Sequence, residues 1–88
     1  MKLIFCNECQ DIIKLQHEKR TCMCGKSWGY YEPDGLHAII GGESIPLGIA
    51  NRSFLLALTN GRRKISQSGI LFDAFVIPDN CDTITKSP

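Results

Sequence analysis

Four cysteines in the first third of the chain carry its clearest chemical signal. They form two close pairs, Cys6 with Cys9 and Cys22 with Cys24, and twelve residues separate the pairs. Thiolate sulfur binds zinc and related metal ions, and two pairs supply the four ligands of one tetrahedral site. The sequence therefore predicts that these four side chains bind a single metal ion.

The residues that follow the two pairs differ. Gly25 follows Cys24, and a glycine there lets the backbone curl so that amide N–H groups point at sulfur. Gln10 follows Cys9, and the second pair has one intervening residue where the first has two. The spacing thus supports a metal site but departs from a regular Cys-x-x-Cys repeat.

This arrangement of the four cysteines and Gly25 between short strands resembles the zinc-ribbon folds, whose cysteine knuckles are similar to those of rubredoxin. The resemblance covers about residues 3 to 32. It implies Zn²⁺ in a closed four-thiolate site with no open position for catalysis. The similarity to rubredoxin implies an alternative, an iron site for electron transfer. The layout of residues 33 to 88 resembles short bacterial and phage zinc-ribbon proteins, which implies no activity.

Short strands and turns are expected to position the cysteine pairs. Residues 1–5 suit a lead-in strand or extended arm, and the β-branched residues after Asp11 suit the first arm of a hairpin that turns at residues 17–20. A hairpin of this length would place the two pairs side by side. The metal site would then form from local structure alone.

Two further segments are expected to form strands. Residues 27–40 suit an aromatic hairpin that turns at Pro33-Asp34-Gly35. Residues 70–77 form the most strand-like run, apolar on both faces, and predict a central strand.

The segment between them is harder to place in a sheet. Residues 45–49 are apolar, but Pro46 has no N–H to donate, so we expect an edge strand or a buried loop. A short helix is predicted over residues 54–59, with Asn51 or Ser53 as its cap.

The 88 residues predict a single domain of the α+β class. We expect a zinc ribbon over residues 1–32, followed over residues 33–80 by a β-hairpin, a short α-helix packed on the antiparallel sheet, and a central strand. Residues 81–88 are expected to fray. A core of this size contributes only about 3–5 kcal/mol to the net free energy of folding, so we expect the fold to need a bound metal for stability.

The net charge predicts no strong electrostatic attraction to polyanions such as nucleic acids. The formal charge is +1, and four thiolates with a divalent cation change it to about −1. We therefore expect a protein partner, which includes the option of a homo-oligomer, ahead of nucleic acid. We expect no membrane contact, because no apolar run reaches the roughly 18–20 residues of a membrane span. The residues before Cys6 are too few for a secretory signal, which favours a reducing, cytoplasmic location.

No group of side chains suggests catalysis. His17 is expected in an exposed turn, and His37 is expected in a strand, with no carboxylate or thiol partner nearby in the sequence. Cys81 has acidic neighbours, which raise the pKa of a thiol. We therefore expect no enzyme activity and assign no catalytic residue.

Two groups of side chains are candidates for a ligand or partner surface. Strand alternation places Trp28 and Tyr30 on one face and Tyr31 on the other, so one set suits the core and the other suits a stacking surface. A basic group near the predicted helix is the second candidate and consists of Arg52, Arg62, Arg63 and Lys64.

Together these features favour a non-catalytic interaction or adaptor module with structural zinc. Three alternatives stay open: a nucleic-acid-binding zinc ribbon, a protein that sequesters a small anionic, nucleotide-like ligand, and a rubredoxin-like iron electron carrier.

Overall fold

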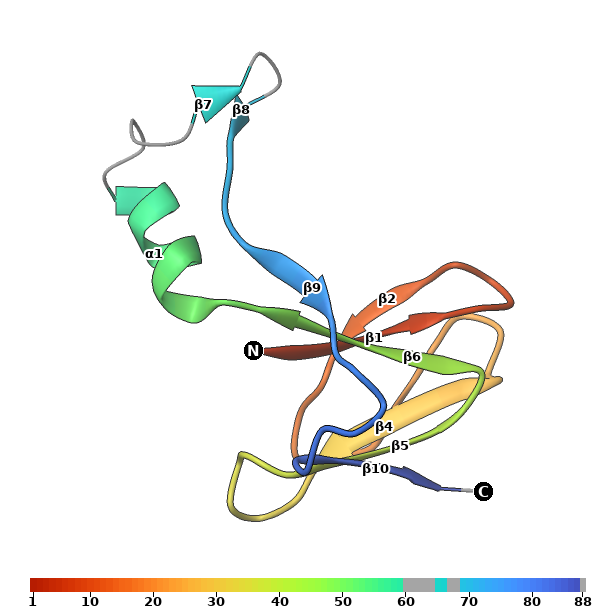
Figure 1. The fold of residues 1–88 in the computed structure, drawn as a ribbon. Helices are drawn as coiled ribbons and strands as arrows, with labels where there is room; N and C mark the ends of the chain where they lie inside the picture. The colour runs from red at the N-terminus through yellow and green to blue at the C-terminus, as the bar shows by residue number, and fades with distance from the viewer. Residues whose placement is uncertain (60–64, 67–68, 88) are drawn as a thin grey trace.

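A computed structural model describes residues 1–59, 65–66 and 69–87 (Figure 1). The chain forms two four-stranded sheets and one two-stranded ribbon, with strand orders β2-β1-β6-β9, β10-β5-β4-β3 and β7-β8. Strand pairs are antiparallel except β10 with β5. The elements are β1 (Lys2–Cys6), β2 (Ile12–Lys14), β3 (Arg20–Thr21), β4 (Ser27–Tyr31), β5 (Ala38–Gly42), β6 (Ser44–Ile49), α1 (Asn51–Thr59), β7 (Ile65–Ser66), β8 (Gly69–Ile70), β9 (Ala74–Val76) and β10 (Ile84–Ser87).

The expected combination of antiparallel strands with one short helix is observed, and it is compatible with the α+β class.

Each cysteine pair forms the turn of its own hairpin. The first pair connects β1 to β2, which are antiparallel partners, and the second connects β3 to β4. The predicted hairpin between the two pairs is therefore wrong, because β2 and β3 belong to different sheets. Strand β2 pairs with β1, and β3 pairs with β4. The two cysteine turns therefore come together because the two sheets pack against each other.

The aromatic hairpin is confirmed. Strand β4 pairs with β5 from Ser27 opposite Gly42 to Tyr31 opposite Ala38. The turn at Pro33-Asp34-Gly35 closes with a hydrogen bond from Gly35 N to the Glu32 carbonyl at 2.9 Å.

The core lies where the two sheets face one another. Side chains alternate along a strand, so one set from β1 and β2 meets one set from β4 and β5. Tyr31 and Ile84 pack against this core from the second sheet. Its buried members are Ile4, Cys6, Ile13, Leu15, Cys22, Ala38 and Ile40. Two of the four clustered cysteines thus belong to the hydrophobic core itself.

Strand β6 is central in its sheet, between β1 and β9, so the expectation of an edge strand or loop at Pro46 is wrong. The carbonyl of Pro46 accepts a hydrogen bond from Ile77 N at 2.9 Å. Because the N and C=O of one strand residue point to the same neighbour, the missing N–H faces Ile77, which lies past the end of β9. The pairing between β6 and β1 therefore loses no hydrogen bond.

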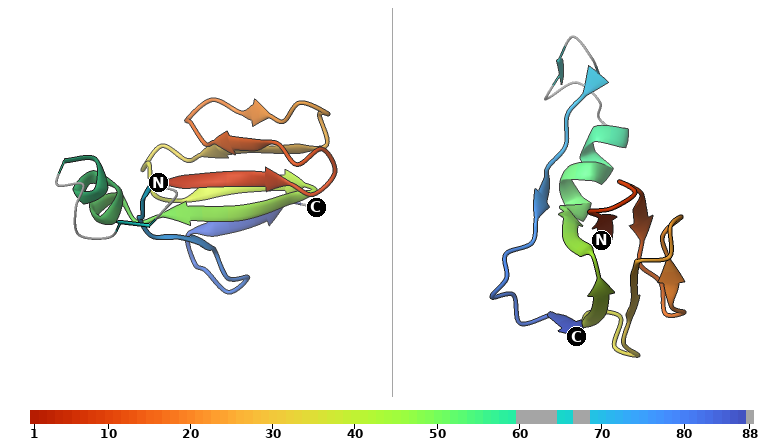
Figure 2. Two further views of the ribbon diagram at one scale, coloured as in Figure 1. Left: turned by 90° about the horizontal axis from the view of Figure 1, so that it is seen from above. Right: turned by 90° about the vertical axis from the view of Figure 1, so that its right-hand side faces the viewer.

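Helix α1 does not pack on a sheet as predicted. It begins at Asn51 and ends at Thr59, none of its nine residues is buried, and it extends from one end of the sheets (Figures 1 and 2). Its closest aromatic contact is between Phe54 and Phe72, with ring centroids 4.8 Å apart. The expected cap residues bind elsewhere: Asn51 Oδ1 accepts from Met1 N, and Ser53 Oγ accepts from Asp73 N.

The segment 70–77 is not a central strand with two buried faces. Only Ala74–Val76 forms β9, which is the last strand in the described order of its sheet, and all three of its residues are exposed. Ile70, Leu71 and Phe72 are exposed as well. Ile77 is buried, but the burial that the apolar pattern predicted for the rest of the segment is not found among the described residues.

The tail predicted to fray instead forms β10. Residues Ile84 to Ser87 pair in parallel with β5, from Ile84 beside Ala38 to Ser87 beside Gly41. Ile84 packs against the core, and this apolar contact explains why the mostly polar C-terminal segment is ordered as a strand. The C-terminal strand and β5 can be followed in Figures 1 and 2.

Candidate metal centre

The four predicted metal-ligating cysteines lie together at one end of the core. Their sulfur atoms are all within 4.8 Å of one another. Cys24 Sγ lies 3.7 Å from Cys6 Sγ and 3.4 Å from Cys22 Sγ. Zinc–sulfur bonds of about 2.3 Å in a tetrahedron require sulfur separations of about 3.8 Å. The observed distances fit a shared metal ion and exceed the roughly 2 Å of a disulfide bond.

The two knuckles differ in length by one residue, but each ends with a residue of positive φ. Gln10 has a φ of 63° and Gly25 a φ of 81°, so the residue after each pair is left-handed. Gln10 N donates to the Cys6 carbonyl at 2.9 Å, and Gly25 N donates to the Cys22 carbonyl at 3.1 Å. The glycine missing from the first knuckle therefore does not change its fold. A glutamine adopts the conformation that a glycine adopts more easily.

Backbone amides point at the sulfur atoms that begin each knuckle. Cys9 N lies 3.5 Å from Cys6 Sγ, and Ser27 N lies 3.3 Å from Cys22 Sγ. The knuckles are also joined, because Met23 N donates to Asp11 Oδ2 at 3.0 Å. Such N–H groups stabilise thiolate charge and orient the ligands.

The closeness of the thiols pulls their pKa values apart. Burial raises the pKa of Cys22, but the Ser27 N–H and the neighbouring thiols more than offset this and lower it to about 6. The Lys26 N–H lowers the pKa of Cys24, but burial and the other three thiols raise it to about 12. Four sulfur atoms this close cannot all be ionised without a cation among them. The donor set therefore fits a metal cation.

A buried hydroxyl supports the same interpretation. Ser27 is completely buried, and its Oγ has no hydrogen-bond partner within the described part of the chain. Burial raises the pKa of Cys6, but the Cys9 N–H and the adjacent Ser27 hydroxyl lower it, and the net shift is downward. An unpartnered buried donor beside a thiol is costly, whereas beside a metal-bound thiolate it has an acceptor. Sequence analysis missed Ser27, although its position three residues after Cys24 was visible.

The burial of the four cysteines differs within each pair. The first member of each, Cys6 and Cys22, is buried, while Cys9 is half-buried and Cys24 is exposed. A metal ion here would close the open end of the core and take all four ligands from the protein. Such a site holds structure together and offers no position for a substrate.

The three aromatic candidates divide between the two faces of the second sheet. Tyr31 packs against the core, and its hydroxyl accepts a hydrogen bond from Lys2 N at 2.8 Å. Trp28 and Tyr30 lie on the opposite face, half-buried, with nearly parallel rings whose centroids are 6.3 Å apart. Lys19 Nζ lies 4.5 Å from the Trp28 ring centroid.

The basic candidates do not form a site in the described structure. Arg52 is exposed on the first turn of α1, while Arg62, Arg63 and Lys64 lie outside the described residues. A cleft of about 730 Å³ lies near the start of α1, and Arg52 does not line it. Its lining includes Lys2, Lys14, Tyr31 and Phe54.

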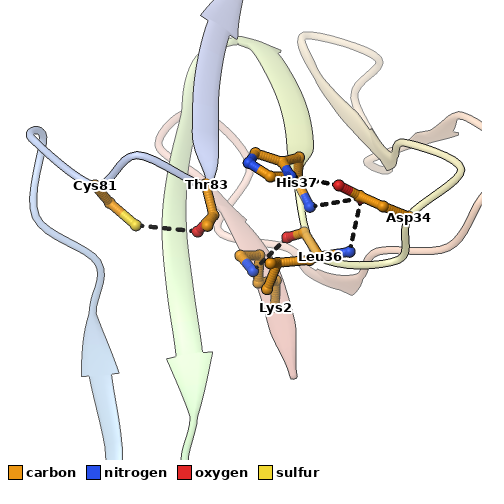
Figure 3. A network of polar contacts seen from close by, with 6 residues as sticks. All are labelled: Lys2, Asp34, Leu36, His37, Cys81 and Thr83. Atoms are coloured by element: carbon orange, nitrogen blue, oxygen red, sulfur yellow. Dashed lines mark hydrogen bonds and ion pairs between the residues drawn. The ribbon is translucent and has the colours of Figure 1, made fainter.

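Polar contacts near the β4–β5 turn differ from the sequence expectation (Figure 3). His37 Nδ1 pairs with Asp34 Oδ2, so this histidine does have a carboxylate partner three residues away.

Cys81 Sγ lies 3.2 Å from Thr83 Oγ1, and Thr83 and Lys2 lower the pKa of Cys81 despite its acidic neighbour Asp82.

Comparison with protein-family models, curated proteins and solved structures found no match. Among the described residues, no helix combines the length and the hydropathy that a membrane span requires. The interpretation of the site therefore depends on its own geometry.

Proposed function

We propose that this chain is a non-catalytic interaction module whose fold depends on one structural zinc ion bound by Cys6, Cys9, Cys22 and Cys24. The observation that carries the proposal is the cluster of four sulfur atoms within 4.8 Å. All four ligands come from the protein, so the metal has a structural role and the function resides on the surface around it.

Exposed apolar side chains support the interaction part of the proposal. Phe75, Val76 and Leu71 are each more than half exposed, and Leu55 and Leu58 on α1 are exposed to a similar extent. Large exposed apolar patches on a small protein commonly mark contact sites, and Val76 lies beside Leu47 on one apolar face of the sheet β2-β1-β6-β9.

Elemental analysis and particle mass test this proposal on one sample, purified without added metal. We expect about one zinc per chain, as a single site with four cysteine ligands requires, and an assembly with itself or with another protein. Iron in place of zinc would support the electron-carrier alternative. Absence of any metal, or a monomer that binds no protein but retains a small molecule, would contradict the proposal.

A second candidate function, binding of single-stranded nucleic acid, is favoured by Trp28, Tyr30 and Lys19. Two nearly parallel aromatic rings on a sheet face suit base stacking, and a lysine beside them suits a phosphate. A mobility shift at about 50 mM salt, where phosphate contacts are strongest, tests it. We expect Trp28→Ala to abolish any shift, with Tyr31→Phe as the control on the core face. No shift with single-stranded DNA or RNA would end this candidate.

A further inference from the structure

The sheet β2-β1-β6-β9 has one face that is almost entirely apolar and has no partner among the described residues. Residues opposite one another in the register share a face, which fixes the members of each side. The side that faces away from the core, called the outer face below, consists of Leu3, Phe5, Ile12, Lys14, Ile45, Leu47, Ile49, Ala74 and Val76. None of these residues is buried.

This face is unlike an ordinary solvent-exposed sheet face. Antiparallel sheets that face water on one side carry mostly polar residues there. Lys14 is the only charged residue of the outer face, and it lies on the edge strand β2. The second sheet differs, since its outward positions mix polar Thr21 and Thr85 with Trp28 and Tyr30.

No described element covers the outer face. Helix α1 extends from the end of the sheets and has no buried residue (Figures 1 and 2). Within the face, Ile12 is 56% exposed and Val76 is 64% exposed. Leu47, at the centre, is partly exposed although its neighbours on this face, Leu3 and Val76, are apolar. Leu3 is partly exposed as well and lies between Leu47 and Lys14.

The area of the outer face is what a small stable interface requires. A large apolar side chain offers on the order of 200 Å², so the exposed fractions leave on the order of 500 Å² of apolar surface per chain. A standard interface buries about 800 Å² per partner, of which about 60% is apolar. The outer face therefore matches the apolar core of one standard interface.

We propose that the outer face packs on the outer face of a second copy of this chain and forms a two-fold symmetric dimer. This inference deepens the proposed interaction function and rests on it. Two such sheets pack with their faces about 10 Å apart, as in a β-sandwich. A second copy is favoured because its outer face offers an equal apolar area, and because the single charge, Lys14, lies on the edge strand where it stays solvated. No acidic residue on the face selects a basic partner.

Sedimentation and light scattering of the metal-loaded protein over a concentration series test the proposal. We expect a mass of twice 9.8 kDa at about 100 μM, because mass action favours the dimer there. Leu47→Glu places a charge at the centre of the face and is expected to weaken the dimer at least about tenfold. Val76→Lys, at an exposed position that packs little in the monomer, is expected to do the same.

Leu36→Glu is the matched control, since Leu36 is 53% exposed and lies in the β4–β5 turn, which contributes no residue to the outer face. Metal content and circular dichroism of each variant show whether it folds. A wild-type protein that stays monomeric at all concentrations, or a dimer that neither Leu47→Glu nor Val76→Lys weakens, would overturn the proposal. A monomer that binds a different protein through this face would also overturn it, yet would leave the proposed interaction function intact.

Discussion

At the scale of single residues, two residues next to the cysteines lead to testable expectations about the proposed metal site. Ser27 places a buried hydroxyl against Cys6, and Gln10 adopts a left-handed backbone that its side chain disfavours. Both features were overlooked or undervalued in the sequence, because a motif search weighs the ligands and the glycines but not what lies behind them. Each gives a prediction.

Ser27→Ala is expected to lower zinc affinity about tenfold, the lower end of the effect of removing a group that orients or hydrogen-bonds a ligand. The reason is that the metal-bound Cys6 thiolate loses a buried donor. Competition with a chromophoric chelator measures the affinity. Circular dichroism of the zinc-loaded variant checks that its fold is retained. An unchanged zinc affinity would contradict the role assigned to Ser27.

Gln10→Gly is expected to raise the free energy of unfolding of the metal-loaded protein by about 1 kcal/mol, because glycine has no side-chain penalty at a positive φ. Gly25→Ala is the converse change at the matching position. No atom lies within 4 Å of the added Cβ, so its cost of about 1 kcal/mol should be conformational only. Chemical denaturation measures both. A destabilising Gln10→Gly would show that the Gln10 side chain has a role of its own.

At the scale of elements, specific contacts stabilise one turn and one edge strand. The β4–β5 turn is held by Asp34, whose Oδ1 accepts from Leu36 N and His37 N, each at 2.9 Å. The C-terminal strand β10 is held by pairing with β5 and by the contact of Ile84 with the core. These two elements can be tested without disturbing the metal site.

Asp34 is expected to make stability depend on pH in acid. Hydrogen bonds from Leu36 N and His37 N lower its pKa from 3.8 to about 2. A lowered carboxyl pKa stabilises the fold above about pH 4, and this contribution is lost as the pH falls through about 2. Asp34→Asn keeps an acceptor but removes the titration, so the fall in melting temperature between these pH values should become shallower. Identical acid profiles for the two proteins would refute this.

Ile84→Ala is expected to lower the free energy of unfolding by about 2 kcal/mol, the low end for a buried aliphatic side chain, because Ile84 is only partly buried. Thr85→Ala, at the next and exposed position of β10, is the control and should change it by less than about 0.5 kcal/mol. Denaturation of both variants provides the measurement. Equal changes in the free energy of unfolding for the two variants would indicate that the Ile84 side chain does not pack against the core in solution.

At the scale of the whole molecule, local features were predictable from the sequence and long-range pairings were not. The cysteine cluster and the 27–40 hairpin followed from short spacings and turn residues. The position of β6 at the centre of its sheet did not, because the effect of Pro46 depends on which neighbour its missing N–H faces. The apolar run at 70–77 predicted a buried strand, but periodicity alone does not say whether such residues are covered, and most of them are exposed.

The central claim is that the four cysteines bind one metal ion on which the fold depends. Melting followed by circular dichroism, before and after chelation, tests it most directly, with Cys6→Ser and Cys81→Ser as paired variants. We predict that chelation and Cys6→Ser each unfold at least the N-terminal third and lower the melting temperature, because a structural metal contributes directly to folding. Cys81→Ser should match the wild type. An unchanged spectrum and melting temperature after complete metal removal would contradict the claim.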